Sequence, residues 1–353
     1  MSICITGGAG FIGSNFVLDW LEHQEEPIIN VDKLTYAGNL KNLSGAKSDR
    51  RHRFIRADIC DAALISHVFA EHKPRAVVHC AAETHVDRSI TGPQGFIETN
   101  VIGTFRLLEA VLGYVDKASS SERASFRFVH ISTDEVYGSL ERDDMPFKET
   151  NQYAPNSPYS ASKAASDHLV RAYHHTYGLQ VLTTNCSNNY GPYQFPEKLI
   201  PLVIHRAVTG QPLPLYGDGQ QVRDWLFVRD HCRAIRRVLE AGRVGETYNI
   251  GGCNEKTNLD VVRTVCRILD ELKPRHDDKS YTEQIAFVTD RPGHDRRYAV
   301  DTTKLRQELQ WEPTETFETG IRKTVQWYLD HQEWIHEITS GAYREWIEGQ
   351  YAA

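Results

Sequence analysis

A glycine-rich turn near the start of the chain constrains its fold more than any other feature. The string GGAGFIG, residues 7–13, follows an apolar run at Ser2–Thr6 and opens an amphipathic stretch. Such a turn between a first strand and a first helix lets the backbone approach a pyrophosphate, whose charge the helix N-terminus meets. Gly7 and Gly10 would form the turn, and Gly13 would allow close helix–strand packing. The turn alone is compatible with an ordinary βα connection, but its position favours a dinucleotide-binding unit.

An acidic residue strengthens this interpretation. Asp32 ends a second apolar run, Ile28–Val31, and lies 22 residues after Gly10. That offset is close to the roughly 20 residues expected of a carboxylate that binds the ribose of a dinucleotide. Because a carboxylate repels a 2′-phosphate, Asp32 favours NAD over NADP as the cofactor. Lys33 follows directly and weakens this preference, and Asp32 alone is also compatible with a turn or capping acid.

Short apolar runs alternate with longer amphipathic stretches through the first half of the chain. Further strands are expected at Ala76–His79, Phe126–Ile131 and Val181–Thr184. Between the first and second of these runs, apolar residues spaced by three or four predict one buried helix stripe. The stripe consists of Ile97, Val101, Phe105, Leu108, Leu112 and Val115. The alternation predicts an α/β fold with a Rossmann-type, doubly wound parallel sheet, which binds ligands beyond the carboxyl ends of its strands.

The length of 353 residues predicts more than one lobe, because a single core rarely grows past roughly 250–300 residues. Residues 1–185 are expected to form the dinucleotide-binding Rossmann domain, to which roughly residues 222–251 return. Proline and glycine become dense after residue 186, which predicts a smaller mixed α/β C-terminal lobe from residues 186–221 and 252–353. The stretch Phe317–Tyr343 is expected to be helical.

Composition and charge exclude several classes of protein. The formal net charge is −7, from 40 Lys and Arg against 47 Asp and Glu, so no nucleic-acid partner is expected. No apolar run approaches the roughly 18 residues of a membrane-spanning helix, and the N-terminus does not resemble a signal peptide. The seven cysteines form no C-x-x-C pair, so we interpret them as buried free thiols of a cytoplasmic protein. The 16 histidines show no metal-ligand spacing, and no metal is expected.

A tyrosine and a lysine are four residues apart in a predicted helix over Ser157–Tyr177. This spacing places Tyr159 and Lys163 on one helix face. A nearby ammonium favours the phenolate and is expected to lower the tyrosine pKa, which would make Tyr159 a base for a hydroxyl proton. The pair is common on exposed helices, so it indicates redox chemistry only because it follows a dinucleotide-binding turn.

Two adjacent acids follow the predicted strand at Phe126–Ile131, at the carboxyl edge of the sheet. The segment is Ser132-Thr133-Asp134-Glu135. Two neighbouring carboxylates in a buried cleft repel each other, so one should hold a proton while the other is ionised. An acid beside a base is the arrangement that an elimination needs. The alternative is a helix start, with Thr133 as the N-cap and two acids in the first turn.

Cationic residues gather in the loop-rich second half. Arg223 lies in GDGQQVRDW, and Arg291 and His294 lie in DRPGHD. Arginine binds phosphate through two parallel hydrogen bonds. Without further context these arginines are expected to be solvated or paired with acids, for which the adjacent Asp224 and Asp290 are candidates.

These motifs resemble the extended short-chain dehydrogenase/reductases and, more narrowly, the dTDP-glucose 4,6-dehydratase family. The resemblance runs from residue 3 to about residue 301 and rests on strings that occur in the family's order. They include ITGGAGFIGSN, VDKLTYAGNL, AAETHVDRSI, HISTDEVYG, YSASKAASDHLV, CSNNYGPYQFPEKLIP, LPLYGDGQQVRDW and RPGHDRRYAVD. The TDE triplet and the SNNYGPYQFPEKLIP string are more diagnostic than the glycine turn. Thr84 stands where a serine also suits the family, and both side chains offer a hydroxyl.

The resemblance implies an internal redox cycle on a nucleotide sugar. Tyr159 would remove the proton of the sugar 4-hydroxyl while C4 is oxidised by NAD. The resulting ketone acidifies the C5 hydrogen, which Glu135 would remove while Asp134 protonates the departing 6-hydroxyl. Return of the hydride to C6 gives a 4-keto-6-deoxy sugar. Thr133 would hydrogen-bond the 4-oxygen, and Lys163 would also hold the nicotinamide ribose.

The resemblance also implies two sets of binding residues and an assembly. The cofactor set consists of Gly7, Gly10, Phe11, Ile12, Gly13, Asp32, Lys33, Leu34, Thr35, Asp58, Ile59, Cys80, Ala81, Ala82, Glu83, Thr84, Thr99, Tyr159, Lys163 and Asn189. The substrate set, for dTDP-glucose, consists of Thr84, Thr133, Asn188, Lys198, Leu199, Pro214, Leu215, Tyr216, Arg223, Asn258, Arg291, His294 and Asp295. Arg223 and Arg291 then become diphosphate ligands. A homodimer is expected, paired through helices near residues 94–117 and 157–176.

Three alternatives stay open at this point. The substrate of a 4,6-dehydratase could carry another base, as in UDP-glucose. A sugar-nucleotide epimerase of the same fold would use NAD and the Tyr-x-x-x-Lys pair but would not need the acids after Thr133. A non-catalytic NAD-binding protein would keep the glycine turn without needing Tyr159, Lys163 or the acids.

Overall fold

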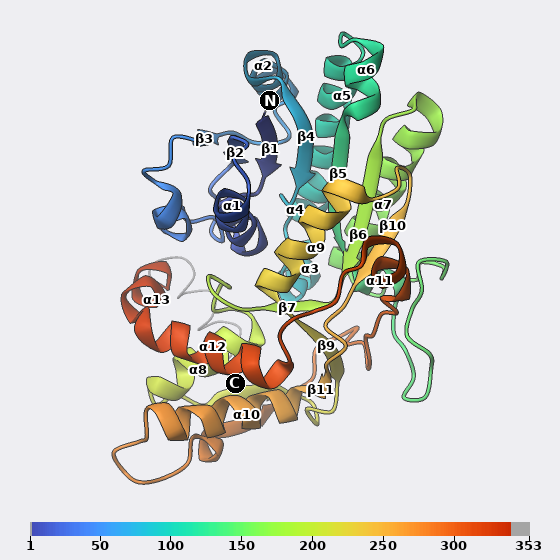
Figure 1. The fold of residues 1–353 in the computed structure, drawn as a ribbon. Helices are drawn as coiled ribbons and strands as arrows, with labels where there is room; N and C mark the ends of the chain where they lie inside the picture. Colours follow the sequence, from blue (N-terminus) through green and yellow to red (C-terminus); the bar gives the residue numbers. More distant parts are fainter. Residues whose placement is uncertain (1, 340–353) are drawn as a thin grey trace.

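The computed structural model describes residues 2–339, and a seven-stranded sheet forms its centre (Figure 1). All neighbouring strands in this sheet are parallel, in the order β10-β6-β5-β4-β1-β2-β3. The strands are β1 (Ser2–Thr6), β2 (Ile28–Asp32), β3 (His52–Arg56), β4 (Pro74–His79), β5 (Arg127–Thr133), β6 (Val181–Cys186) and β10 (Thr247–Ile250). The predicted doubly wound Rossmann-type sheet is therefore confirmed. The edge strand β3 was not predicted, because its side chains are only partly buried and mostly polar.

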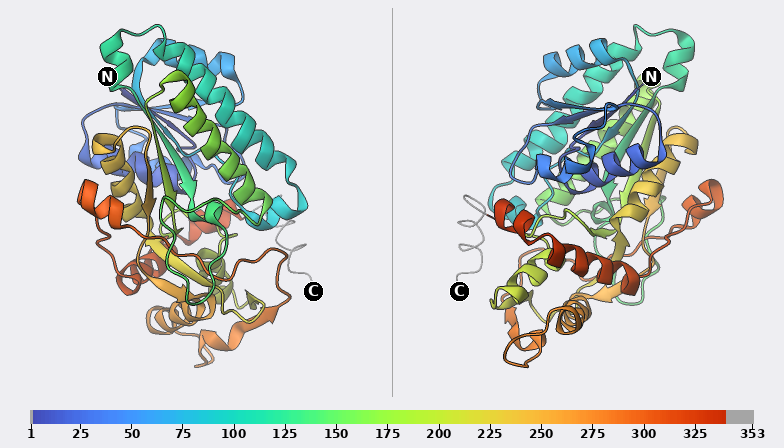
Figure 2. Two further views of the ribbon diagram at one scale, coloured as in Figure 1. Left: turned by 90° about the vertical axis from the view of Figure 1, so that its right-hand side faces the viewer. Right: turned by 60° about the vertical axis from the view of Figure 1, so that its left-hand side comes forward.

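Helices cover both faces of the sheet. One face carries α1 (Phe11–His23), α9 (Val228–Ala241) and α11 (Thr303–Leu309), and the other carries α2 (Ala62–His72), α5 (Thr104–Val115) and α7 (Pro158–Tyr177). Figure 2 shows α5 and α7 lying side by side. Successive residues of a strand point to opposite faces, so Ile3 and Ile5 enter one core while Cys4 enters the other. Helices cover both faces, which is why the inner strands are buried on both sides and do not alternate between buried and exposed residues.

A smaller lobe lies beyond the carboxyl edge of the sheet (Figures 1 and 2). It has a three-stranded sheet in the order β11-β9-β7 and a two-stranded sheet of β12 and β8. Its strands are β7 (Asn188–Tyr190), β8 (Leu213–Tyr216), β9 (Val222–Phe227), β11 (Glu255–Thr257) and β12 (Ile285–Val288). Its helices are α8 (Leu199–Val208), α10 (Asn258–Leu272), α12 (Phe317–Asp330) and α13 (Gln332–Ile338). These elements share a separate apolar core.

The chain passes between the two parts more than once. The strand Val222–Phe227 belongs to the small sheet, whereas the following helix α9 and strand β10 join the large one. Leu305, Leu309 and Trp311 also pack into a core of the large sheet. These contacts favour a proposed division in which the return begins at residue 228 and residues 303–311 belong to the Rossmann domain.

Short helices complete the described structure. They are α3 (Val86–Thr91), α4 (Gln94–Phe96), α6 (Ser120–Ser125), a π-helical turn at Ile97–Gly103, and 3₁₀ helices at Leu40–Ala46, Asp134–Tyr137 and Tyr281–Gln284. In the part of the chain described, no helix combines the length and the apolar composition that crossing a membrane requires. All seven cysteines are free thiols, but Cys253 is exposed and Cys60 and Cys80 are partly exposed, so the prediction that they are buried was wrong for these three.

Two helix predictions need correction. The π-helical turn at Ile97–Gly103 adds a residue to one turn and rotates the following helix, so the predicted stripe is not continuous. Ile97 is 45% exposed, while Leu107 and Val111, which were not in the stripe, are buried. The predicted helix over residues 317–343 breaks at His331 into α12 and α13, and its last four residues lie outside the described part of the chain.

Candidate active site

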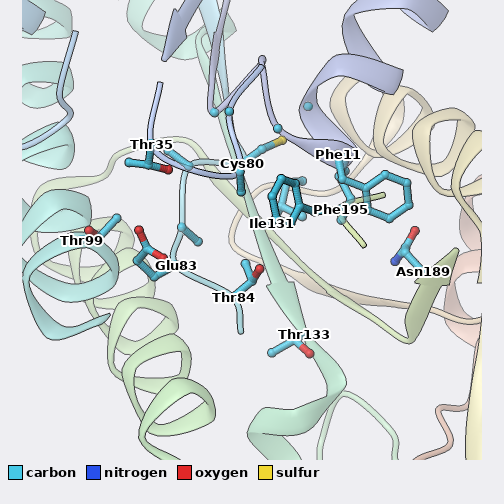
Figure 3. A pocket seen from close by; sticks show the side chains of 18 of the residues that line it. Phe11, Thr35, Cys80, Glu83, Thr84, Thr99, Ile131, Thr133, Asn189 and Phe195 are labelled. Carbon is cyan, nitrogen blue, oxygen red and sulfur yellow. The ribbon is translucent and has the colours of Figure 1, made fainter. Parts of the chain in front are cut away.

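A pocket opens at the carboxyl edge of the large sheet, where it faces the small lobe (Figure 3). The ends of β1, β2, β4, β5 and β6 supply its floor. Every residue of the predicted cofactor set except Leu34 lines this pocket, and so do the acids Asp134 and Glu135. Leu34 has a left-handed φ of +58° and packs partly against a core of the large sheet.

The glycine turn forms a cradle that side chains would fill. Gly7 has a φ of +72°, and a Cβ there would lie 2.6 Å from the backbone nitrogen of Ala81. A Cβ on Gly13 would lie 2.1 Å from the carbonyl oxygen of Gly7, so the helix α1 packs directly onto the turn. Gly10 caps α1 without a side chain, and the first turn of α1 holds no acid. The free N–H groups of this turn suit a phosphate group of a dinucleotide.

Asp32 shapes the loop that follows β2. Its Oδ2 atom accepts a hydrogen bond from the Ala9 N–H at 2.9 Å, and its Oδ1 atom accepts one from the Leu34 N–H at 2.7 Å. Burial raises the pKa of Asp32, and these two backbone donors oppose that rise. Lys33 forms an ion pair with Asp58 at 2.6 Å. Since Asp58 already neutralises Lys33, this lysine does little to attract the 2′-phosphate of NADP.

The tyrosine and the lysine both enter the pocket from the start of α7. A capping box between Ser157 and Ser160, with a proline in the first turn, fixes where the helix begins. Lys163 donates from Nζ to the Ile131 carbonyl oxygen at 2.8 Å. Burial and the negative charge of Glu135 raise the pKa of Tyr159 well above its usual value. The predicted lowering of this pKa is therefore wrong for the protein without ligands, because burial disfavours the phenolate.

Behind Lys163, the same helix face carries a buried acid. Asp167 accepts a hydrogen bond from the Ser132 hydroxyl at 2.8 Å and lies 3.1 Å from Nε2 of His130. Burial raises the pKa of Asp167 to about 6, and the ammonium of Lys163 opposes the rise. Asp167 in turn raises the pKa of Lys163 against the lowering caused by burial. Asp167 is the counter-charge that helps keep this lysine protonated.

The adjacent acids begin a 3₁₀ helix, so the helix-start alternative is also realised. Thr133 ends β5, and its Oγ1 accepts from the Glu135 N–H and donates to the Asp134 carboxylate, both at 3.3 Å. Asp134 is 1% exposed, and its Oδ2 atom has no hydrogen-bond partner among the described residues. A buried carboxyl oxygen in this position favours the neutral acid.

The two acids experience different electrostatic surroundings. Burial, Glu135 and Asp224 raise the pKa of Asp134 well above its usual value. Burial also raises the pKa of Glu135, but the cations Arg291, Lys198 and Arg223 oppose that rise. These surroundings favour a proton on Asp134 more strongly than on Glu135, whereas the adjacency of the two acids predicted only that one of them would hold it.

The cations of the small lobe have partners other than those predicted. Arg291 pairs with Asp87 at 2.7 Å, and Arg223 donates to the Asp295 carbonyl oxygen at 2.9 Å and stacks on the ring of Tyr298. The predicted pairs with the neighbouring acids are wrong, because Asp224 instead accepts from two backbone N–H groups in the segment 252–254. Asp290 is paired with His294 at 2.6 Å.

The predicted substrate residues divide into two groups. Thr84, Thr133, Asn188 and Lys198 line the pocket. The others lie outside its lining: Leu199, Pro214, Leu215, Tyr216, Arg223, Asn258, Arg291, His294 and Asp295. Several of them are near it, since Tyr216 donates to Asp87, the partner of Arg291, at 3.1 Å. Leu215 is buried in the core of the small lobe.

Some lining residues were not predicted. They are Val31, Ala37, Gly38, Ala57, Ile131, Ser132, Cys186, Ser187, Gln194, Phe195 and Glu197. Each is within five residues of a predicted one, so proximity to the motifs was the available signal. Within residues 2–339, no three His, Cys, Asp or Glu side chains come together to hold a metal ion.

Comparison with known proteins identifies the family. A sequence model described as GDP-mannose 4,6 dehydratase matches residues 4–324. A dTDP-glucose 4,6-dehydratase from Xanthomonas campestris pv. campestris (strain B100) is 61% identical and the match covers 96% of each chain. One from Shigella flexneri is 58% identical, with 99% of each chain covered.

A solved structure gives the same result. The dTDP-glucose 4,6-dehydratase of Streptomyces venezuelae, with NAD and TYD bound, is 45% identical to this chain. The two structures superpose with a TM-score of 0.87, over 96% of this chain and 100% of that chain. The resemblance inferred from the motifs is thus confirmed over almost the whole length, and the chain belongs to the family of dTDP-glucose 4,6-dehydratases.

Proposed function

We propose that this protein is an NAD-dependent enzyme that converts dTDP-glucose into dTDP-4-keto-6-deoxyglucose and water. The observation that carries the proposal is the divided pair of acids, Asp134 and Glu135, beside Tyr159 in one pocket. An epimerase of this fold needs a tyrosine base but neither of these acids. The relatives with this activity are 58–61% identical over nearly the whole chain, which supports the same assignment.

The cofactor-binding role belongs to the glycine turn and the ends of β2 and β4. The turn at residues 7–13 would hold the pyrophosphate, Asp32 the adenosine ribose, and Lys163 the nicotinamide ribose. Bound NAD supplies the oxidation at C4 of the sugar and the later reduction at C6, with no net change. The lining chains around this space include Thr35, Cys80 and Thr99 (Figure 3).

The chain's own residues move three protons. Tyr159 accepts the proton of the 4-hydroxyl, while Thr133, at the end of β5, hydrogen-bonds the 4-oxygen. The 4-ketone acidifies the C5 hydrogen, and Glu135, near three cations, takes it as the base. Asp134 holds the proton that the 6-hydroxyl needs in order to leave as water. When the hydride returns to C6, Glu135 gives its proton back to C5, which completes the product and restores the base. The opposite roles follow from the different pKa shifts of the two neighbouring acids.

The diphosphate would be held by the cations of the small lobe. Arg223, Arg291 and Lys198 are the cations that act on Glu135, so they lie within electrostatic reach of the pocket. Arg291 is already paired with Asp87, so a diphosphate would compete with that carboxylate for the guanidinium. His294, Tyr216 and Asn188 complete this proposed site.

One experiment tests both the reaction and the nucleotide base of the substrate. The holoenzyme is incubated with dTDP-glucose and, in parallel, with UDP-glucose, and products are followed by mass and by the alkaline absorbance of a 4-keto sugar. We expect loss of one water from dTDP-glucose and much slower loss from UDP-glucose. Inversion at C4 with no change in mass would identify an epimerase. Faster turnover of UDP-glucose than of dTDP-glucose would show that the preferred substrate is the UDP sugar.

We also propose a cytoplasmic homodimer. Ile97 and Ile102, 45% and 44% exposed, are apolar side chains at the start of the segment expected to pair with a second copy. Light scattering of the wild type should give twice the mass of one chain, and in Ile97→Glu the measured mass should fall toward that of a single chain. A monomeric wild type would overturn this assembly.

A further inference from the structure

A cluster of three side chains outside the reaction centre joins the two parts of the molecule. Tyr36 lies in the loop after β2, Arg88 in α3, and Glu197 in the segment before α8 of the small lobe. Tyr36 donates from its hydroxyl to Oε1 of Glu197 at 3.0 Å. The guanidinium of Arg88 stacks 3.7 Å from the centre of the Tyr36 ring, and its Nε lies 3.5 Å from Oε2 of Glu197.

The cluster is buried, and it combines one hydrogen bond, from Tyr36 to Glu197, with the ion pair between Arg88 and Glu197. The side chain of Glu197 is 2% exposed, so its carboxyl oxygens depend on the protein for partners. Separating Glu197 from Tyr36 and Arg88 without admitting water would leave an unpaired buried carboxylate, which is costly. Burial raises the pKa of Glu197 to about 7, and Lys198 and Arg88 are the main groups that oppose the rise.

Both loops tied by the cluster line the pocket. Thr35, next to Tyr36, borders the cofactor region from the large domain, and Phe195 borders it from the lobe (Figure 3). Lys198 of the lobe also lines the pocket. The ring of Phe195 meets the Tyr36 ring edge-on, with centroids 5.5 Å apart. Lys198 donates to the Thr84 carbonyl oxygen at 2.8 Å, which adds a second tie between the lobe and the loop after β4.

Contacts at this place affect the rate at which the cofactor dissociates more than the rate of the chemical steps. Tyr36 and Arg88 do not line the pocket, so they act only through the loops that they connect. The proposed reaction leaves its cofactor in the starting oxidation state after every turnover, so exchange is not needed for catalysis. A contact that must break before the loops separate slows dissociation.

We propose that Tyr36, Arg88 and Glu197 are positioning residues that hold the loop after β2 against the lobe and so retain bound NAD. The inference rests on the proposed function for the identity of the cofactor. It predicts that breaking the cluster raises the rate of cofactor loss while the reacting groups stay in place.

The first test is Tyr36→Phe, which removes one hydroxyl and keeps the ring that contacts Arg88 and Phe195. The holoenzyme is mixed with excess fluorescent etheno-NAD, and the exchange rate is measured without any sugar. We expect exchange about tenfold faster than in the wild type, as for loss of a hydrogen bond to a charged group. The rate of turnover per NAD-loaded site should stay within about twofold, since the hydroxyl does not reach the reacting atoms.

Tyr281→Phe is the matched control. Tyr281 is buried in the lobe and donates to the Lys273 carbonyl oxygen at 2.8 Å, away from the pocket. Tyr281→Phe also removes one hydrogen-bonded tyrosine hydroxyl, but outside the pocket, and this variant should exchange the cofactor at the wild-type rate. Equal acceleration in both variants would overturn the proposal, because it would reflect general loosening, and so would wild-type exchange in Tyr36→Phe.

Glu197→Gln and the double variant test whether the cluster acts as a unit. At a pH above the Glu197 pKa of about 7, Glu197→Gln removes the charge that Arg88 faces, and we expect severalfold faster exchange. Within one unit the double variant should exchange about as fast as the faster single variant. If the double variant instead multiplied the accelerations of the two single variants, Tyr36 and Glu197 would act independently, and this result would contradict the proposal of one cluster. The exchange assay needs no sugar, so absence of dehydratase activity would refute the proposed function while leaving this measurement interpretable.

Discussion

The two walls of the active-site cleft satisfy their charged groups in opposite ways. We call the residues at the ends of the strands and the start of α7 the sheet wall: Thr133, Asp134, Glu135, Tyr159 and Lys163. We call the basic residues across the cleft the lobe wall: Lys198, Arg223, Arg291 and His294, whose pKa burial lowers to about 4. Among the described residues, the sheet wall contains a buried carboxyl oxygen without a hydrogen-bond partner, whereas the basic side chains of the lobe wall already contact carboxylates or carbonyl oxygens.

This difference separates reactivity from recognition. A buried group with few partners changes its protonation readily when a neighbour changes charge. A cation with a resident anion keeps its place and exchanges that anion for another. Substitutions in the sheet wall should therefore lower the rate of a chemical step, whereas substitutions in the lobe wall should weaken substrate binding.

The largest effect is expected for Tyr159→Phe. Without the phenolic oxygen, no residue at this position takes the 4-hydroxyl proton, and the first oxidation should slow by about 10³-fold or more. Stopped-flow absorbance at 340 nm after addition of dTDP-glucose should show no accumulation of bound NADH. NADH formation at the wild-type rate would remove Tyr159 from this role.

Glu135→Gln should stop the reaction one step later. The amide cannot accept the C5 proton, so dehydration should fall by about 10³-fold while C4 oxidation and nucleotide binding persist. Exchange of the C5 hydrogen with deuterated solvent, followed by NMR, measures the step directly. Near-normal exchange would show that another group is the base.

Asp134→Asn should have a smaller effect, about 10²-fold, on the departure of water. The amide keeps the shape of the neutral acid but has no proton to give to the 6-hydroxyl. Rapid-quench analysis should show C4 oxidation affected less than loss of water. Equal damage to the two steps would mean that Asp134 has a broader structural role.

Arg291→Lys tests the lobe wall. Lysine keeps the charge but loses the planar pair of donors, so the KM for dTDP-glucose should rise about tenfold with kcat changed less. Steady-state kinetics at saturating NAD measures the split. A fall in kcat with unchanged KM would place Arg291 functionally with the sheet wall.

The smallest effect concerns stability and its pH dependence in Asp167→Asn. Since the pKa of Asp167 is raised to about 6 in the folded protein, this carboxyl binds its proton more tightly folded than unfolded. We therefore compare the free energies of unfolding of the wild type and the variant. The wild-type value minus the variant value should decrease as pH rises from about 4 to 6 and then level off. Urea titrations across this range measure it, and a pH-independent difference would contradict the shift.

The sequence predicted the sheet wall better than the lobe wall for a physical reason. Strand ends and helix starts carry their chemistry in short strings, so Gly7, Asp32 and the Tyr159–Lys163 spacing identify their own positions. Partners in the lobe wall come from distant parts of the chain, as Asp87 and Arg291 do. Local adjacency therefore suggested the wrong acids for Arg223 and Arg291.

Local sequence patterns also could not predict how burial shifts the pKa of a side chain. Lys163 was expected to lower the pKa of Tyr159, but burial and the charge of Glu135 raise it in the folded protein without ligands. Tyr36 and Glu197 are 161 positions apart and were not singled out as a pair, because nothing short of the tertiary fold brings them together.

The wide turn at Ile97–Gly103 has a consequence for tolerance of length changes. Asn100 lies within it, is buried, and binds both the backbone of Glu83 and the hydroxyl of Ser162. Loss of one residue here would restore ordinary α-helical winding and leave the flanking turns close to their present faces, because the wide turn holds one residue more than an α-helical turn. The change would be local: the amide of Asn100 owes its position against the loop at residues 83–84 to the wide turn, so a single-codon deletion should break these hydrogen bonds while the rest of the helix keeps its packing.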